Sequence, residues 1–218
     1  MTPAEAIAKM RINAPPRANR TLRDLLTRVN ADAQLRAWWH VANVNAVKRL
    51  EINDHSWVHV QVVTNIALKL IRQLTKHGVE PAVVTDHGMT NDDAEIVVVL
   101  GALLHCVGMA VHRDGHEDFS LFLAEPKMRQ LLAGLYEEPE LTVIVCEVLQ
   151  AITSHRAVAR SIETMAVMSC PSDPRGSFAR PRRIAGCSQW LREPFGRRGW
   201  TRQLPVVSPA WFRIREGW

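Results

Sequence analysis

The sequence predicts an all-α fold between about residue 21 and residue 168. Apolar residues recur there every three or four positions, the spacing that gathers them on one face of a helix. The chain has 218 residues and 47% of them are hydrophobic, which is enough for one domain with a substantial core. Helices with one apolar face bury those faces against one another, so we expect a helical bundle.

The first helical region follows a polar lead, residues 1–20. Apolar residues keep helical spacing from Thr21 to about Leu50. A further helix is predicted from about His55 to Lys76, with Asp54 as its N-cap and Gly78 at its end. The apolar residues on one face of that helix are Val58, Val62, Ile66, Leu70 and Leu74.

Three more helices are expected after a loop over residues 79–90. The first begins at Asn91-Asp92-Asp93, and its β-branched run 96–100 also fits a parallel strand. A helix is favoured because the apolar run continues to Val111, well beyond the length of a strand. The other two helices are expected over about 117–135, with a break at Pro126, and over about 138–154.

Compartment and membrane association follow from three negative signals. The first residues lack the apolar core of a secretory signal. The longest apolar run, residues 96–111, falls short of the roughly 20 residues that cross a bilayer. The four cysteines at 106, 146, 170 and 187 lack the spacing of a disulfide framework. We therefore expect a reduced, cytoplasmic protein with no membrane partner.

The net charge of +5 is distributed unevenly along the chain. Residues 1–155 hold 15 Lys and Arg against 18 Asp and Glu, whereas residues 156–218 hold 12 Arg against four acids. The segment 169–218 is rich in Arg, Trp and Pro without sustained periodicity, so we expect it to be irregular. Trp190, Trp200 and Trp211 alternate with Arg, a pattern also found in proteins that bind single strands. Disorder or a non-native end is the favoured interpretation, so nucleic acid is not the expected partner.

The candidate site is a group of histidines at the end of the apolar run. His105, His112 and His116 follow one another there, and neutral imidazole is the commonest metal ligand in proteins. Residues 53–59, ending in His59, and residues 103–109, containing His105-Cys106, resemble two motifs of the HD-domain superfamily of metal-dependent phosphohydrolases. That family carries a His on one helix, a His-Asp pair on the next and a distant Asp. Cys106 stands where the family has Asp.

The resemblance, which covers about residues 52–155, implies a set of metal ligands. His59 and His105 would hold the first metal ion, and His116 and His155 would serve a second one. Each histidine could instead be an ordinary polar or buried residue. Cys106 has three open interpretations: a thiolate that prefers a soft ion, a weakened site, or a small buried hydrophobe.

The substrate side of the site is less defined. His112, Arg113 and Arg156 are the candidate catalytic and phosphate-binding residues, because Arg contacts phosphate in a bidentate way. No phrase resembling the family's distal Asp motif follows. Asp173 lies between Pro171 and Pro174, which disfavour a helix there.

The expected function is hydrolysis of a nucleotide or another small-molecule phosphoester, which Cys106 and the missing distal Asp would impair. The resemblance implies a divalent metal ion, Mn, Mg, Fe or Zn, which polarises phosphoryl oxygens and lowers the pKa of water. The alternative is a catalytically inactive HD-fold protein with a binding or regulatory role. An oligomer is compatible with either function.

Overall fold

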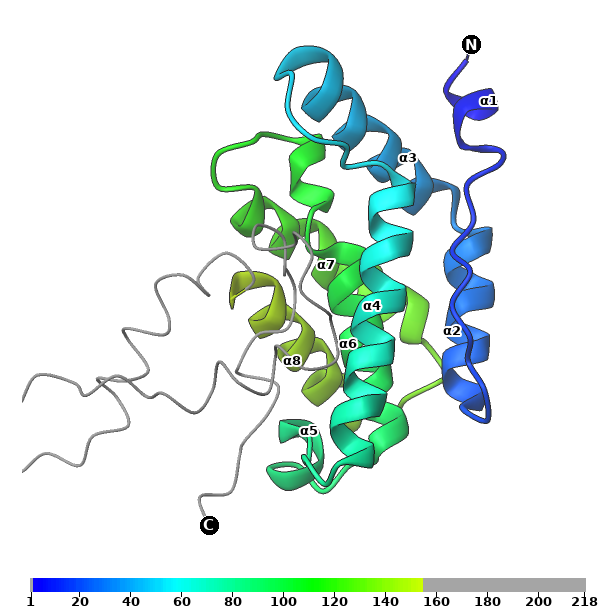
Figure 1. Ribbon diagram of the computed structural model, residues 1–218, viewed down its shortest axis with the longest axis vertical. Coiled ribbons are helices and arrows are strands. Elements are labelled where there is room, and N and C mark those ends of the chain that lie inside the picture. The colour runs from blue at the N-terminus through cyan, green and yellow to red at the C-terminus, as the bar shows by residue number, and fades with distance from the viewer. Residues whose placement is uncertain (1, 155–218) are drawn as a thin grey trace, which may run out of the picture. The chain divides into compact units, whose positions relative to one another are not determined.

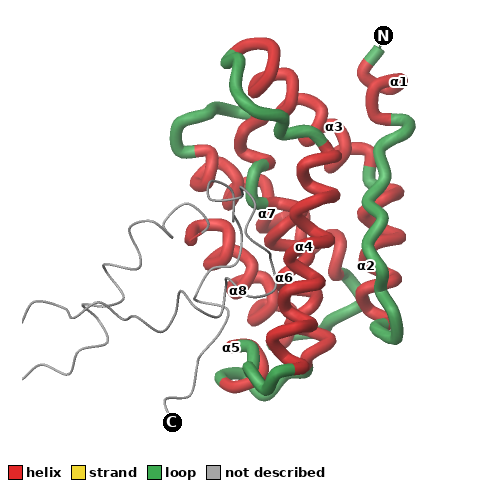
Figure 2. Tube along the Cα trace, in the orientation of Figure 1, coloured by secondary structure: helices red, strands yellow, loops and turns green. Residues whose placement is uncertain are grey.

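The structure, a computed structural model, describes residues 2–154 of the chain. Those residues form helices and no strand, so the predicted all-α class is confirmed (Figures 1 and 2). The elements are α1 Pro3–Ile7, α2 Arg20–Ala31, α3 Ala33–Asn43, the π-helix η1 Val44–Arg49, α4 Trp57–Lys76, α5 Ala82–Thr85, α6 Asn91–Leu104, the 3-10 helix η2 Val107–Ala110, α7 His116–Leu132 and α8 Glu140–Ser154. The segment 169–218 and the predicted domain end at 168 lie outside the described residues.

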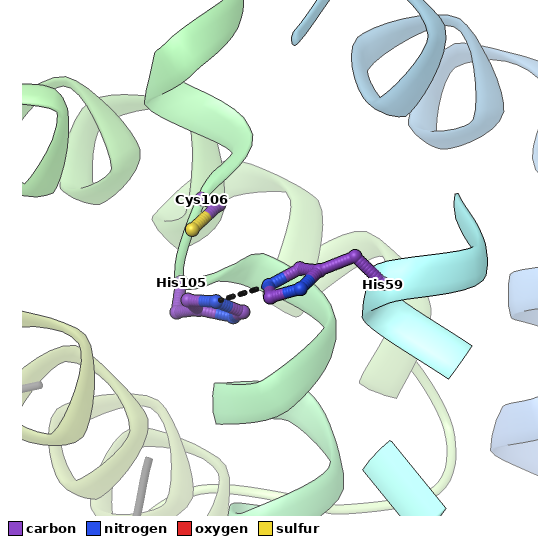
Figure 3. A group of neighbouring side chains, drawn as sticks. All are labelled: His59, His105 and Cys106. Atoms are coloured by element: carbon purple, nitrogen blue, oxygen red, sulfur yellow. Dashed lines mark hydrogen bonds between the residues drawn. The ribbon is translucent and has the colours of Figure 1, made fainter. Parts of the chain in front are cut away.

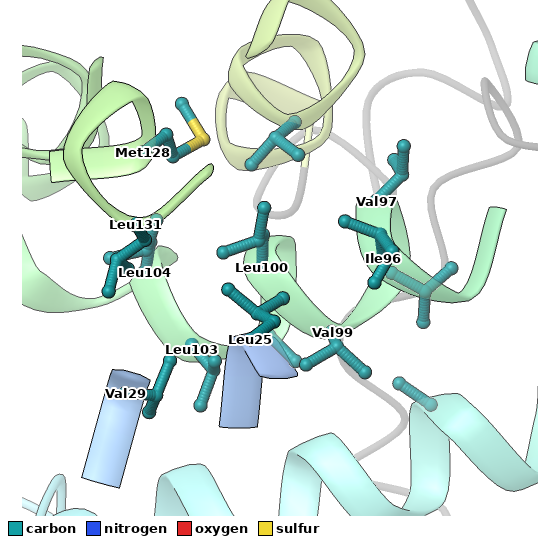
Figure 4. Close-up of a cluster of buried hydrophobic side chains, with 14 of the residues drawn as sticks. Leu25, Val29, Ile96, Val97, Val99, Leu100, Leu103, Leu104, Met128 and Leu131 are labelled. Atoms are coloured by element: carbon teal, nitrogen blue, oxygen red, sulfur yellow. The ribbon is translucent and has the colours of Figure 1, made fainter. Parts of the chain in front are cut away.

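Helix α6 is the centre of the core. Every residue from Ile96 to Leu104 is buried, and α6 contacts α2, α4, α5, α7 and α8. Its side chains pack with Leu25 and Val29 of α2 and with Met128 and Leu131 of α7 (Figure 4). The competing strand interpretation of residues 96–100 is therefore wrong. A helix covered on all sides needs no polar face, which explains why helical periodicity is weak in this segment.

The segment around α6 is longer than the apolar run alone suggests. Asn91–Ala110 spans 20 residues, so by length and composition it is able to cross a membrane. However, 83% of its apolar window is buried inside the protein, as in the core helix of a soluble domain. The high hydropathy of this segment is therefore explained by its burial among the other helices. Its length alone does not distinguish it from a membrane-spanning helix.

The predicted helical rhythm from residue 21 to residue 50 is interrupted at Asp32. This residue ends α2 and caps α3 in an extended conformation, and its Oδ1 accepts a hydrogen bond from the Leu35 N–H at 2.8 Å. Its Oδ2 lies 2.7 Å from Nζ of Lys127, which is only 3% exposed. The helix therefore ends at Asp32 although the apolar spacing continues, because the side chain of Asp32 caps the next helix and pairs with a buried cation.

The start of α4 differs from the prediction by two residues. Ser56, not Asp54, is the N-cap, and its Oγ accepts from the Val58 N–H. Asp54 supports this cap, because its carboxylate accepts hydrogen bonds from both the N–H and the hydroxyl of Ser56. His55 therefore lies in the loop before α4 and not on its first turn.

The apolar face predicted for α4 points mostly outward. Val58, Val62 and Ile66 are 46%, 50% and 51% exposed, while the face against the core is offset by a residue or two. The buried residues of α4 are Val60, Val63, Thr64, Ala67, Leu68 and Ile71. Both faces are apolar, so spacing alone did not identify the one that α6 covers.

Three smaller expectations also needed correction. The polar lead contains α1, and the predicted loop over residues 79–90 contains α5. Helix α7 runs through Pro126 without the predicted break. Pro126 cannot bond the carbonyl of Phe122 four residues earlier, but both residues are exposed, so water can take its place.

Candidate metal centre

The site is built where α6 ends inside the protein. The last four carbonyls of a helix lack partners within it, and in a buried end they need side-chain donors. His105 Nδ1 lies 2.9 Å from the carbonyl of Ala102, and the indole Nε1–H of Trp39 donates to the carbonyl of Leu103 at 3.0 Å. The first of these bonds orients the imidazole of His105, so that its Nε2 points away from the helix.

The turn after α6 is fixed by Ser120 of α7. Its hydroxyl donates to the carbonyl of His105 at 3.1 Å and accepts from the N–H of Gly108 at 2.8 Å. Gly108 allows this approach, because a Cβ at its position would overlap the backbone of His116 and Ser120. The backbone on either side of Cys106 is thus held at two points.

His59 of α4 faces His105 across the site (Figure 3). The two Nε2 atoms are 3.4 Å apart, and the ring centroids are 5.5 Å apart. With Cys106, these residues offer two imidazole nitrogens and one sulfur that all lie within 4.8 Å of one another. This is the donor set of Cys/His zinc sites, so the residues present fit a metal ion.

The surroundings of His59 favour its neutral, metal-binding form. Burial lowers the pKa of His59 below its ordinary value, and the charge of nearby His55 lowers it further, while Asp54 acts in the opposite direction. The ring of His55 lies 5.3 Å from that of His59. Only neutral imidazole binds a metal ion, so a lowered pKa keeps the ligand available at lower pH.

Cys106 is 8% exposed and packs against apolar residues. Its cluster contains Ala42 of α3, Ala46 of η1 and Met109 of η2. This packing fits the interpretation of Cys106 as a buried hydrophobe, whereas its position beside His59 and His105 fits a metal ligand. The two interpretations are compatible, because a thiol can pack when protonated and ligate when ionised.

His116 lies outside the group formed by His59, His105 and Cys106. His116 is buried at the start of α7, with its Nδ1 3.0 Å from the carbonyl of Arg113 and 3.3 Å from a carboxylate oxygen of Glu117. Its assignment to a second metal stays a prediction.

The predicted catalytic residues are partly described. The ring of His112 is exposed and accepts from the Asp114 N–H at 3.1 Å. The guanidinium of Arg113 lies 3.8 Å from the sulfur of Met109, next to the cluster that holds Cys106. His155 and Arg156 lie outside the described residues.

Sequence reasoning missed Trp39 and Ser120. Neither has chemistry that marks it as part of a metal site, and both act through the backbone around His105. One signal was present in the sequence: an apolar helix that ends at a buried residue must find donors for its last carbonyls. Spacing does not reveal which side chains supply them.

Comparison with known proteins gives one relative and no function. No family model matches the chain, and no solved structure matches it significantly. The chain is 39% identical over 115 residues to the uncharacterized protein MJ1020 of Methanocaldococcus jannaschii. The match covers 53% of this chain and 44% of that protein, so the chain spans less than half the length of its relative.

Proposed function

We propose that the chain is a metal-dependent phosphohydrolase of the HD-domain class that acts on a nucleotide or another phosphoester. The observation that carries this proposal is the convergence of His59 with the consecutive pair His105-Cys106, although His59 and His105 are 46 residues apart in the sequence. They lie on segments that resemble the family's first-His helix and its His-Asp helix, in the same order.

The roles of the residues follow from their contacts. His59 and His105 would hold the ion, with Cys106 as the third donor. When bound, a divalent ion polarises phosphoryl oxygens and lowers the pKa of water. The hydrogen bond from His105 Nδ1 to Ala102 fixes the ring and its tautomer, as carbonyl partners do for metal-bound histidines elsewhere. Arg113 is a candidate to neutralise a phosphate, since its guanidinium reaches Met109, which packs in the same cluster as Cys106.

A second function is favoured by one specific observation. Cys106 occupies the position of the family's Asp and packs among Ala42, Ala46 and Met109. A site that has exchanged a carboxylate for a packed thiol would bind a metal ion without supporting hydrolysis. The alternative is therefore a metal-binding HD-fold protein with a binding or regulatory role.

Turnover of bis(p-nitrophenyl) phosphate separates the two functions. The full chain, stripped with a chelator and reloaded with Zn²⁺, Mn²⁺, Fe²⁺ or Mg²⁺ in turn, should release p-nitrophenol with at least one ion. His59→Ala should lose that activity, and its circular dichroism spectrum should stay helical.

The matched control is His77→Ala, at the exposed end of the same helix, where the ring forms a hydrogen bond with the Gln73 carbonyl. This variant should keep full activity. If the protein binds a metal ion but hydrolyses neither this diester nor nucleoside phosphates, the proposed hydrolase function is rejected. The metal-binding protein with a binding or regulatory role then remains as the function. Equal turnover in His59→Ala would reject the site itself.

A further inference from the structure

We infer that this centre is a tetrahedral zinc site with Cys106 as a thiolate ligand, and that it discriminates against Mn²⁺ and Mg²⁺. The inference rests on the metal site of the proposed function, but it does not require hydrolysis. Three observations lead to it: the separation of the two imidazoles, the chemistry of the third donor, and the way in which the site is held.

The separation of the imidazole nitrogens matches a tetrahedral ion. Two ligands at zinc–nitrogen distances of about 2.0–2.1 Å and a tetrahedral angle are about 3.3–3.4 Å apart. Adjacent ligands of octahedral Mg²⁺ at a similar bond length would be only about 2.8–3.0 Å apart. The observed Nε2–Nε2 distance between His59 and His105 is 3.4 Å. The same separation is that of the hydrogen bond between the two rings drawn in Figure 3.

The third donor is soft. Thiolate ligands favour zinc and other soft or borderline ions, whereas Mg²⁺ and Mn²⁺ favour carboxylate and water. Cys106 is 8% exposed among Ala42, Ala46 and Met109. An ionised thiol is costly in such apolar surroundings unless a cation compensates its charge. An ion that bonds strongly to sulfur therefore gains most from this position.

The core holds the three donors close to one another. The ring of His105 is fixed by Ala102, and the backbone carbonyl of His105 is fixed by Ser120. Two of the three donors are consecutive residues, so the position of Cys106 is tied to that of His105. Because the arrangement is largely fixed, an ion that requires right angles between these ligands would have to move the two rings closer together.

Cobalt substitution tests the inference directly. The full chain, freed of metal and titrated with Co²⁺, should give intense visible bands of tetrahedral cobalt and a near-ultraviolet sulfur-to-cobalt charge-transfer band. One equivalent of Zn²⁺ should remove both, and excess Mn²⁺ or Mg²⁺ should not. In Cys106→Ser the charge-transfer band should disappear, and Zn²⁺ affinity should fall by roughly 100-fold or more, since even partners of ligands cost about 10–100-fold.

Two further variants complete the experiment. Cys146→Ser is the control, because Cys146 is an exposed free thiol on α8, and its spectrum should equal that of the wild type. In Cys106→Asp the charge-transfer band should vanish and Mn²⁺ should compete better with Zn²⁺. Should Cys106→Ser not fold, the wild-type spectrum and the competition series still decide the matter.

Weak bands of octahedral cobalt, or Mn²⁺ competing equally with Zn²⁺ in the wild type, would overturn the inference. So would a charge-transfer band that survives in Cys106→Ser. These results are independent of the phosphodiester assay. A tetrahedral cobalt–thiolate spectrum without turnover rejects only the hydrolase, and Mn²⁺-dependent turnover that Cys106→Ser leaves unchanged rejects only the zinc site.

Discussion

Gly108→Ala should destabilise the protein severely, because Gly108 lies where η2 meets the start of α7. An added Cβ would overlap the carbonyl oxygen of His116, and it would lie 2.5 Å from the backbone nitrogen of Ser120. Ordinary contact begins at about 3.4 Å, so Ser120 would have to retreat by about 0.9 Å. Backbone cannot rotate away as a side chain can, and therefore the helix itself must move.

The magnitude follows from two contributions. Overpacking a core costs about 1–3 kcal/mol and occasionally more. Moving α7 also breaks the 2.8 Å hydrogen bond from the Gly108 N–H to Ser120, and an unsatisfied buried donor costs about 1–3 kcal/mol. The two costs overlap, so we expect a loss of about 3 kcal/mol or more. That is a large share of the 5–15 kcal/mol typical of a domain.

Urea unfolding followed by circular dichroism measures this loss. Gly88→Ala is the matched control, because a Cβ there meets nothing within 4 Å, although φ is +67°. The left-handed conformation should cost the control only about 1–2 kcal/mol. Gly108 has no positive φ, so its effect is purely steric. A Gly108→Ala variant within about 1 kcal/mol of the wild type would refute the close approach of η2 and α7.

Three further substitutions test other contacts. Trp39→Phe should cost about 1–2 kcal/mol in urea unfolding, because the Leu103 carbonyl loses its indole donor; an unchanged midpoint would contradict this cap. Thr64→Val should raise the melting temperature, since the fully buried Thr64 hydroxyl has no partner within the described part of the chain; a loss of stability would reveal one. Burial alone would raise the pKa of Asp32, but hydrogen bonds from Lys127 and the backbone lower it below its ordinary value. The stability that this shift supplies is therefore present above about pH 5 and is lost as pH falls through 4 and below. Asp32→Asn keeps a capping side chain, and in this variant the free energy of unfolding should depend less on pH below about 5. An unchanged pH dependence would show that the Asp32–Lys127 pair is not its cause.

The all-α class and the positions of most helices followed from periodicity, because that signal is summed over many residues. The predictions of helix boundaries and buried faces were wrong where a single local contact decides the structure against the periodic pattern. Asp32 divides a helical rhythm by capping α3 and pairing with Lys127. On α4 both faces are apolar, so the pattern could not show that Val62 faces outward. Which face is covered depends on the neighbouring helix, and periodicity carries no information about neighbours.

The candidate site was predictable to a different extent. His59 and His105 were identified by resemblance, and the structure brings their Nε2 atoms to 3.4 Å. Cys106 was identified as a departure from the family, and the structure places it beside both. The residues that position them, Trp39 and Ser120, bind backbone carbonyls, and any buried donor of the right reach could do so. Their identity therefore depends on the packing and not on the chemistry of the site.

The end of α6 connects the core to the site. A buried helix end requires donors for its last carbonyls, and here one donor is the ring of His105 itself. The ring nitrogen that satisfies Ala102 is Nδ1, so the helix end determines which nitrogen faces His59. Trp39 and Ser120 satisfy neighbouring carbonyls and keep that end in place. The geometry of the two imidazoles is thus a consequence of how the core helix ends. A small substitution at position 106 should leave this geometry in place, because none of these hydrogen bonds uses that side chain, and the side chain at that position then decides which ion the site prefers.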